Sequence, residues 1–355
     1  MGQIVLNAVE KVYPGGVRAV KNASLVVEDG EFVTIVGPSG CGKTTTLRTL
    51  AGFEQPTSGT VGLGGIEVDG VPPNERDTGM VFQDFALFPH MTVGENIAFG
   101  LTVGGDWPED EVDDRIADML ALVELSGFED RMPDQLSGGQ QQRIALARAL
   151  APEPEVLLLD EPLASLDKQL RESMQVELRR IQEQIGITTI LVTHNQTEAL
   201  TMSDRIAVMN DGRFEQVGTP TEVYQQPATK FVADFIGTAN VFDGTVQELG
   251  DGRVTVDCDG VEFEALAPDG VAVGDAVTVV TRPEHTVVEL DTARSNVLEG
   301  EVSVSRFLGD HHECHVTLPS GTTVVGVVDD DGPAVAGGDK VSLGVDAEDC
   351  LVVVE

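Results

Sequence analysis

Short apolar runs rich in β-branched residues alternate with stretches of helical periodicity over residues 1–237. Five runs are apolar on both faces, as the strands of a parallel sheet covered by helices are. They span residues 32–36, 79–82, 156–159, 189–192 and 205–209. Residues 109–127 carry apolar side chains at helical spacing, so a helix is predicted there. The pattern is that of an α/β domain.

The helical periodicity ends near residue 237, and short Val-rich runs separated by Gly and Asp follow. This second part contains a repeat, because segment 240–246 returns as 296–302 and segment 274–279 returns as 338–343. Two copies of a five-strand unit, at about 240–290 and 296–354, predict a small OB-like β-barrel. We therefore expect two domains, 1–237 and 238–355.

The charge restricts the class of partner. The sequence has 60 acidic against 22 basic residues, a formal net charge of −38. A protein that binds the nucleic-acid backbone needs the opposite sign, so nucleic acid is not an expected partner. Carboxylates spread over the whole chain suit a cytoplasm at high salt, where screening weakens self-repulsion. We hypothesise a halophilic source.

The remaining composition indicates an intracellular location. The four cysteines form no CxxC pair, as expected for reduced thiols in a cytosol. The first residues lack the pattern of a signal peptide, and no apolar run reaches the length of about 18 residues that spans a bilayer. A role at a membrane is therefore expected to depend on partners.

Residues 37–44 match the phosphate-binding pattern GxxxxGK[ST], between an apolar run and a helix predicted at 45–50. The glycines let the backbone wrap a phosphate, and the amides at the helix N-terminus point at it. Lys43 is expected to pair with the β- and γ-phosphates, and the Thr44 hydroxyl to bind Mg²⁺. The expected nucleotide-binding residues of this segment are Gly37, Pro38, Ser39, Gly40, Cys41, Gly42, Lys43, Thr44 and Thr45.

Two features near this loop have simpler interpretations. The amide dipoles around Cys41 could lower the pKa of its thiol, although a small residue that fills the loop is the favoured interpretation. A second Gly-rich stretch, 62–65, has no Lys and no following helix. We interpret it as a hairpin turn.

The apolar run 156–159 ends in two carboxylates, Asp160 and Glu161. Asp160 is expected to hold Mg²⁺ through its coordination shell, and Glu161 to orient or deprotonate an attacking water. Such a strand is weak evidence by itself. Together with the phosphate loop it predicts a nucleoside triphosphatase.

The string Leu136-Ser137-Gly138-Gly139-Gln140, followed by Gln-Gln-Arg and a helical stretch at 144–150, resembles the signature motif of ABC ATPases. A simple Ser N-cap is the alternative, but it accounts only for the serine. The resemblance implies an α/β P-loop ATPase with a helical subdomain at about 84–150. It also implies a head-to-tail homodimer, in which one copy completes the ATP site of the other. The residues supplied in this way are Ser137, Gly138, Gly139, Gln140 and Asp167.

The same resemblance assigns roles to further residues. Tyr13 resembles the aromatic residue that stacks on adenine, and Val20 the small apolar residue near the base. Gln83 resembles the glutamine that reaches Mg²⁺ and the attacking water. His194 resembles the histidine that contacts the γ-phosphate. For Tyr13 and His194 a purely structural role is the alternative.

Two positions depart from the usual pattern of the family. Ala164 and Ser165 stand in the reverse of the more common order, which affects a hydroxyl contact. Asn195 follows His194 where Asp is usual, which affects a contact across the dimer interface.

The resemblance extends to the second part of the chain and to partners. Residues 281–284 resemble a strand motif of the TOBE-like regulatory barrel behind importer ATPases. The segment from Gln83 to His90 resembles the surface that receives two transmembrane permease subunits, with an extracytoplasmic solute-binding protein as an indirect partner. The chain is therefore expected to be the ATP-hydrolysing subunit of an importer, peripheral on the cytoplasmic face of the cell membrane, with ATP and Mg²⁺ as cofactors.

The cargo is less constrained. Segments 82–93, 201–209 and 231–237 resemble the polyamine type, which favours spermidine- or putrescine-like solutes. Fe(III), molybdate or tungstate, sulfate, thiamine and sugars stay open. A soluble, non-transport ABC ATPase is the alternative of a different class.

Overall fold

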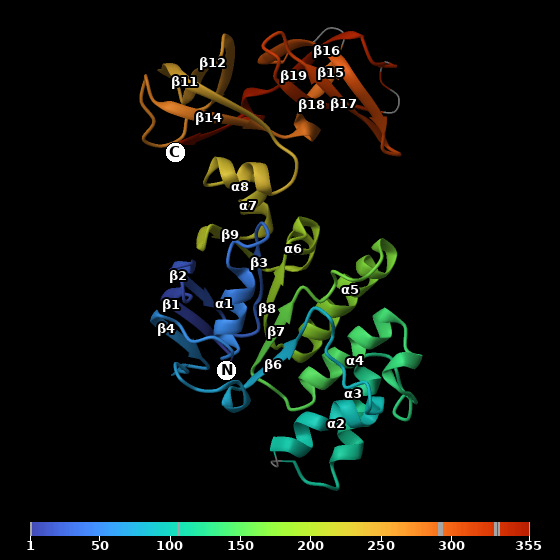
Figure 1. Ribbon diagram of the computed structural model, residues 1–355. Coiled ribbons are helices and arrows are strands. Elements are labelled where there is room, and N and C mark those ends of the chain that lie inside the picture. Colours follow the sequence, from blue (N-terminus) through green and yellow to red (C-terminus); the bar gives the residue numbers. More distant parts are fainter. Residues whose placement is uncertain (1, 105–106, 290–293, 330–331, 333, 355) are drawn as a thin grey trace. The chain divides into compact units, whose positions relative to one another are not determined.

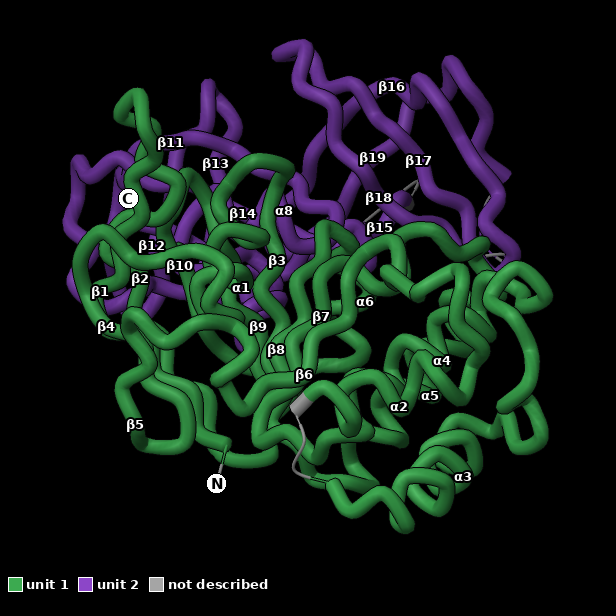
Figure 2. Tube along the Cα trace, turned by 60° about the horizontal axis from the view of Figure 1, so that its bottom comes forward, with its two compact units in different colours: residues 1–221 green, residues 222–355 purple. Residues whose placement is uncertain are grey.

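Figure 1 shows the computed structural model of the chain, which describes residues 2–104, 107–289, 294–329, 332 and 334–354. The chain divides into two compact units, Met1–Thr221 and Glu222–Glu355 (Figure 2). The division falls before the predicted boundary at 237. The first predicted repeat ends at about residue 290 and the predicted second domain at residue 355. Both positions lie outside the described residues.

The first unit contains two sheets among its described residues. One is antiparallel, in the order β2-β1-β4-β5, with β1 (Ile4–Val12), β2 (Arg18–Val27), β4 (Ser58–Leu63) and β5 (Ile66–Glu67). The other has the order β10-β9-β3-β8-β7-β6, with β3 (Phe32–Val36), β6 (Thr78–Val81), β7 (Val156–Asp160), β8 (Thr188–Thr193), β9 (Arg205–Asn210) and β10 (Arg213–Gly218). All neighbours in the second sheet are parallel except β9 and β10. The five predicted runs are its parallel strands, and β4 and β5 form the hairpin predicted around 62–65.

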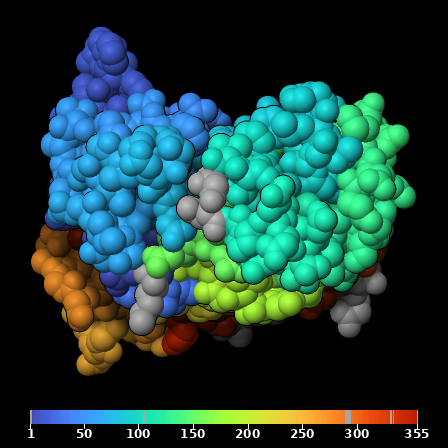
Figure 3. Space-filling model, turned by 90° about the horizontal axis from the view of Figure 1, so that it is seen from below, coloured from blue at the N-terminus to red at the C-terminus, as the bar shows by residue number. Residues whose placement is uncertain are grey.

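The helices of the described residues are α1 (Lys43–Leu50), α2 (Val93–Gly104), α3 (Val112–Leu122), α4 (Gly138–Leu150), α5 (Lys168–Ile185), α6 (Gln196–Met202), α7 (Pro220–Gln225) and α8 (Lys230–Phe235). Helices α2, α3 and α4 pack on one another. On the face shown in Figure 3, this helical segment (cyan to green) forms one mass and the chain before β6 (blue) forms another.

Helix α3 is shorter than the helix predicted at 109–127. It ends because Glu124 adopts a left-handed backbone conformation, with φ of 58°. The amide of Glu124 donates to the carbonyl of Ala121, and the amide of Leu125 to the carbonyl of Leu120. This is a Schellman C-cap, a position where glycine is usual. Because a glutamate occupies it, the pattern of the sequence did not reveal the helix end.

The central sheet is covered on both faces, as its apolar strands predicted. In β7, Leu157 and Leu159 belong to a core cluster with residues of α2, α4 and α5. Val156 and Leu158, whose side chains point to the opposite face, belong to a cluster with residues of α1 and the antiparallel sheet.

After the end of α7 and the helix α8, the second unit is built mainly from strands arranged in two groups. The first sheet has the order β13-β12-β11-β14-β20, and the second group closes into a barrel, β15-β18-β17-β16-β19. The strands are β11 (Asn240–Gly250), β12 (Arg253–Cys258), β13 (Val261–Leu266), β14 (Ala276–Thr281), β15 (Val287–Glu289), β16 (Asn296–Phe307), β17 (His311–Thr317), β18 (Thr323–Asp329), β19 (Lys340–Val345) and β20 (Leu351–Val354). The two repeats exchange their last strands, because β15 pairs with β18 and β19 whereas β20 pairs with β14.

Two equivalent asparagines, at the starts of β11 and β16, join the repeats. The Asn240 side chain accepts from the amide of Val325 at 2.7 Å and donates to the same residue's carbonyl at 2.8 Å. Asn296 makes the same pair of bonds with Glu264, at 2.7 and 2.9 Å. Both asparagines are buried. Each asparagine side chain thus pairs with the backbone N–H and C=O of one residue, Val325 or Glu264, as a neighbouring strand would.

Candidate nucleotide site

The strand order brings the predicted site segments together. Strands β3, β8, β7 and β6 are consecutive neighbours in the sheet. At their carboxyl ends lie, in that order, the phosphate loop, His194, the pair Asp160 and Glu161, and Gln83. Because neighbouring strands are about 4.8 Å apart, these segments form one row along one edge of the sheet. Segments up to 157 residues apart in the sequence, as from Gly37 to His194 (194 − 37), meet there.

The phosphate loop joins β3 to α1 in the predicted strand–loop–helix arrangement. Lys43 is 5% exposed, and its Nζ donates to the carbonyls of Gly37 at 2.7 Å and Pro38 at 3.0 Å. The ammonium is therefore held inside the loop. Gly42 has φ of 113°, and a Cβ there would collide with the carbonyl of Ala19, so only glycine fits at this position.

Thr44 and Asp160 are the residues suited to Mg²⁺. The Thr44 side chain acts as a hydrogen-bond donor that lowers the pKa of Asp160, so the two groups lie near each other. Burial raises the pKa of Asp160, partly offset by the cations Arg48 and Lys43. A hydroxyl and a buried carboxylate are the oxygen ligands that a hard divalent cation prefers. The residues present therefore fit the ion that the sequence predicted.

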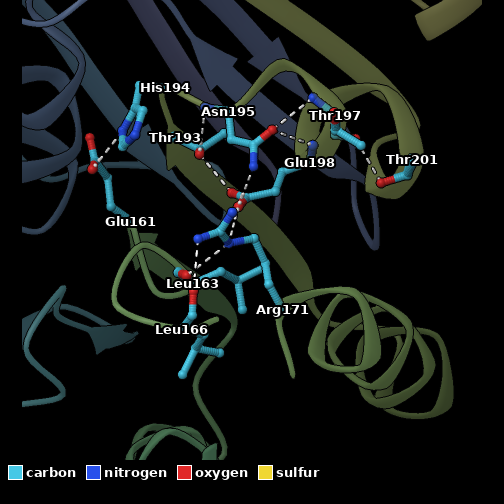
Figure 4. A network of polar contacts seen from close by, with 10 residues as sticks. All are labelled: Glu161, Leu163, Leu166, Arg171, Thr193, His194, Asn195, Thr197, Glu198 and Thr201. Atoms are coloured by element: carbon cyan, nitrogen blue, oxygen red, sulfur yellow. Dashed lines mark hydrogen bonds and ion pairs between the residues drawn. The ribbon is translucent and has the colours of Figure 1, made fainter. Parts of the chain in front are cut away.

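Glu161 is held in a strained conformation at the end of β7. Its φ is 46°, in the left-handed region that non-glycine residues avoid, at a cost of about 1–3 kcal/mol. Its amide donates to the carbonyl of Val192 in β8. Its Oε2 lies 2.9 Å from Nδ1 of His194. The backbone thus directs the carboxylate towards the histidine of the neighbouring strand (Figure 4).

Cys41 does not have the activated thiol that its place in the loop suggested. Its side chain is 5% exposed and packs in the same core cluster as Val20 and Leu47. Burial raises the pKa of Cys41, and this effect exceeds the opposing effects of Lys43 and the loop amides. The physical reason is the loss of hydration of the thiolate. The alternative, a small residue that fills the loop, describes the structure.

The other residues expected near the nucleotide differ in their exposure. The Tyr13 hydroxyl is 3.4 Å from Oγ1 of Thr45, and its ring is half-buried beside the phosphate-loop helix. Val20 is completely buried beneath the loop, so here it supports the loop. Gln83 is exposed. The contacts of these side chains with a nucleotide stay predictions.

The predicted signature segment forms the N-terminus of α4. Ser137 accepts from the Gln140 amide at 3.4 Å, and the Gln140 side chain accepts from the Ser137 amide at 3.0 Å. This capping box confirms the N-cap that was the simpler interpretation. A Cβ on Gly139 would be 3.0 Å from Leu170, so the glycine permits close packing of α4 on α5. In Figures 1 and 2, α4 and α1 lie on different sides of β7 and β8.

Asp167 and Asn195 begin the helices α5 and α6. Asp167 accepts from the amide of Leu170 at 3.0 Å. Asn195 accepts from the amides of Thr197 at 2.9 Å and Glu198 at 3.4 Å. Both side chains therefore act as N-caps within the chain, in addition to the intersubunit roles that the resemblance implies.

Two residues that were not predicted from the sequence, Arg148 and Asn96, shape the segment after Gln83. Phe85 and Ala86 both have positive φ, and Arg148 of α4 donates to their carbonyls at 2.8 and 2.6 Å. Asn96 is completely buried and bonds with the backbone of residues 88, 91 and 92. Both side chains bind backbone atoms, and such bonds leave no recognisable sequence pattern.

Comparison with known proteins agrees with this geometry. Residues 20–164 match the ABC transporter family, and residues 279–353 match the TOBE domain. A spermidine/putrescine import ATP-binding protein PotA from Rubrobacter xylanophilus is 50% identical over 344 residues, which are 96% of this chain and 90% of that protein. The chain belongs to the ABC transporter family.

Further similar proteins support this assignment. The PotA protein of Thermobifida fusca is 53% identical over 312 residues, 86% of this chain and 81% of its own. A dimeric post-hydrolysis structure of the ATP-binding cassette MJ0796, bound to ADP and Pi, covers 61% of this chain and 98% of its own, with 35% identity and a TM-score of 0.55. The α/β P-loop fold and the importer-type ABC ATPase with a TOBE domain are thus confirmed. In the part of the chain that the structure describes, every helix is too short or too polar to cross a bilayer.

Proposed function

We propose that this ABC ATPase hydrolyses ATP to drive the import of a polyamine such as spermidine or putrescine. The row of site segments along β3, β8, β7 and β6 carries the hydrolysis part of the proposal. The cargo rests on relatives such as those of Rubrobacter xylanophilus and Thermobifida fusca, which are named spermidine/putrescine import ATP-binding proteins.

Each residue of the row has a role in phosphoryl transfer to water. The phosphate loop wraps the β-phosphate, and Lys43 exchanges its contacts with the loop carbonyls for the β- and γ-phosphate oxygens. Thr44 and Asp160 would hold Mg²⁺, which supplies positive charge against the phosphates when bound. Glu161 orients the attacking water and accepts its proton. His194, bonded to Glu161, is placed to donate to the γ-phosphate.

We propose that the active species is a head-to-tail homodimer. The N-terminus of α4 has amides at Gly138 and Gly139 that can bind an anion, but this end lies apart from the phosphate loop of the same chain. A second copy would bring Ser137 and its glycines to the γ-phosphate, with Asp167 at the interface. The similar cassette MJ0796 has been solved as a dimer with ADP and Pi.

The segment from Gln83 to His90 is the proposed contact with two permease subunits. Its backbone is held by Arg148 at residues 85 and 86 and by Asn96 at residue 88, so it presents a defined surface. Arg148 also joins that surface to the signature helix α4. Movement of α4 on ATP binding can therefore reach the permease. Through these subunits the protein would sit peripherally on the cytoplasmic face of the membrane and serve an extracytoplasmic solute-binding protein.

The cargo is tested by uptake in cells. A strain of the source organism from which the gene for this protein has been deleted is complemented with the wild-type gene or with the Glu161→Gln variant. Uptake into the two strains is then compared for labelled spermidine, putrescine, ferric iron, molybdate, sulfate, thiamine and maltose. We expect only the polyamines to depend on Glu161. Dependence of another solute, with polyamine uptake unchanged, would refute the cargo but not the ATPase.

A further inference from the structure

A buried glutamate connects two loops of the proposed site (Figure 4). Glu198 lies in the first turn of α6 and is 2% exposed. Its Oε2 accepts from the Thr193 hydroxyl at 2.6 Å, and its Oε1 from the Asn195 side-chain amide at 3.1 Å. Thr193 and Asn195 are the neighbours of His194 in the sequence. Glu198 therefore holds the histidine loop from both sides.

The same carboxylate faces Arg171 of α5. Nε of Arg171 lies 3.9 Å from Oε1 of Glu198. The guanidinium also donates to the carbonyls of Leu163 at 3.3 Å and Leu166 at 2.8 Å. These carbonyls belong to the loop that leads to Asp167. One arginine thus joins the carboxylate of the histidine loop to the backbone of the loop that is expected at the dimer interface.

The identity of residue 195 fits this arrangement. An asparagine can cap α6 with its oxygen and donate to Glu198 with its nitrogen. Burial raises the pKa of Glu198, and the Thr193 hydroxyl, Arg171, His194 and Asn195 all act in the opposite direction. The charged carboxylate therefore depends on these neighbours.

We propose that Glu198 and Arg171 are positioning residues that couple loop 193–195 to loop 163–167. The loop that carries His194, and the loop that carries Asp167, then keep one geometry together instead of moving independently. Neither Glu198 nor Arg171 touches the substrate. Any effect of this coupling on the rate of ATP hydrolysis rests on the proposed roles of His194 and Asp167. The coupling between the two loops can be measured independently of those roles.

Amide hydrogen exchange of the full-length protein tests the coupling directly. Glu198→Gln removes the charge that holds Arg171, and we expect several-fold faster exchange in loop 163–167, although Glu198 has no bond to it. Arg171→Lys loses the donation to the carbonyls of Leu163 and Leu166, which fixes the cation opposite Glu198. The carboxylate is then held less firmly, and we expect faster exchange at 193–197. The coupling is refuted if Glu198→Gln accelerates exchange only in loop 193–197 and Arg171→Lys only in loop 163–167.

Matched controls come from a second pair on α5. Glu177 is also buried, and Arg180 bonds both to Glu177, at 2.7 Å, and to the carbonyl of Leu122, but to neither loop. Glu177→Gln and Arg180→Lys should therefore leave exchange in both loops unchanged. A loss of protection in both loops with these controls would indicate general loosening and overturn the proposal.

Kinetics add a readout that a purely structural role would not move. For Glu198→Gln and Arg171→Lys we expect about a tenfold lower kcat, with KM for ATP within about twofold. The double variant should be no slower than the slower single one, because the residues act as a unit. Additive losses would contradict the coupling. Hydrolysis by Glu161→Gln at the wild-type rate would instead refute the proposed chemistry, while the exchange result still decides the coupling.

Discussion

The replacement of Glu161 by glutamine separates ATP binding from hydrolysis. Glutamine has the same shape and, at φ of 46°, carries the same backbone strain, so the fold should be unaffected. Its amide can still bond with Nδ1 of His194, 2.9 Å away in the native protein. What it cannot do is accept a proton from water. The substitution therefore removes one chemical property and leaves the geometry in place.

The size of the effect follows from the role of a general base. Such a group contributes about 10²- to 10⁴-fold to the rate, which corresponds to about 3–5 kcal/mol of activation free energy. We expect kcat to fall by at least about 10²-fold, with ATP affinity retained. The free energy of unfolding should change by less than about 0.5 kcal/mol. The variant should accumulate as an ATP-bound dimer, because closure is no longer followed by hydrolysis.

Phosphate release at saturating MgATP measures the rate, and light scattering after size exclusion measures the dimer. Glu153→Gln is the matched control, since Glu153 is also a glutamate with left-handed φ, 57°, and contacts Arg115 away from the row of site segments. We expect this control to turn over at the wild-type rate. A general base contributes far more than about threefold to the rate. If Glu161→Gln releases phosphate within about threefold of the wild-type rate, Glu161 is therefore not the base, and the role inferred from the strand order is wrong.

Further predictions concern stability and the response to conditions. Arg76→Met should lower the free energy of unfolding by about 2–4 kcal/mol in urea titrations, because the buried guanidinium donates to four carbonyls at the end of α1 and in residues 68 and 71. Burial raises the pKa of Cys258 and of Cys350 to about 12, whereas an unfolded thiol ionises near 9. Stability should therefore fall as the pH rises from 9 towards 12, by about 1 kcal/mol per thiol at pH 10, and Cys258→Ala should make the fall shallower. Asn240→Leu should destabilise the second unit by about 2–3 kcal/mol in calorimetry, because it leaves the amide and carbonyl of Val325 unpaired. With a net charge of −38, the protein should become more stable as KCl increases, and a melting temperature independent of KCl would contradict the halophilic source.

The local patterns of the chain determined the elements and the kind of chemistry. The phosphate loop, the acidic end of β7 and the signature string are each continuous segments, so the residues that act together are adjacent in the sequence. The five parallel strands were predicted for the same reason. Each strand is buried on both faces, so its residues form a continuous apolar run in the sequence. The end of α3 at Glu124 is the exception, because an unusual residue occupies a position where glycine is the usual signal.

The tertiary structure alone decided which segments meet. The order β3, β8, β7, β6 follows from how helices and sheets pack, and it places His194 between the phosphate loop and Glu161. Tertiary packing also decided the exchange of β15 and β20 between the repeats. It likewise decided the bonds that Arg148, Arg171 and Glu198 make. These are contacts between residues far apart in the chain. A side chain that bonds to a distant backbone atom leaves no spacing or periodicity, so such contacts exist only once the chain is folded.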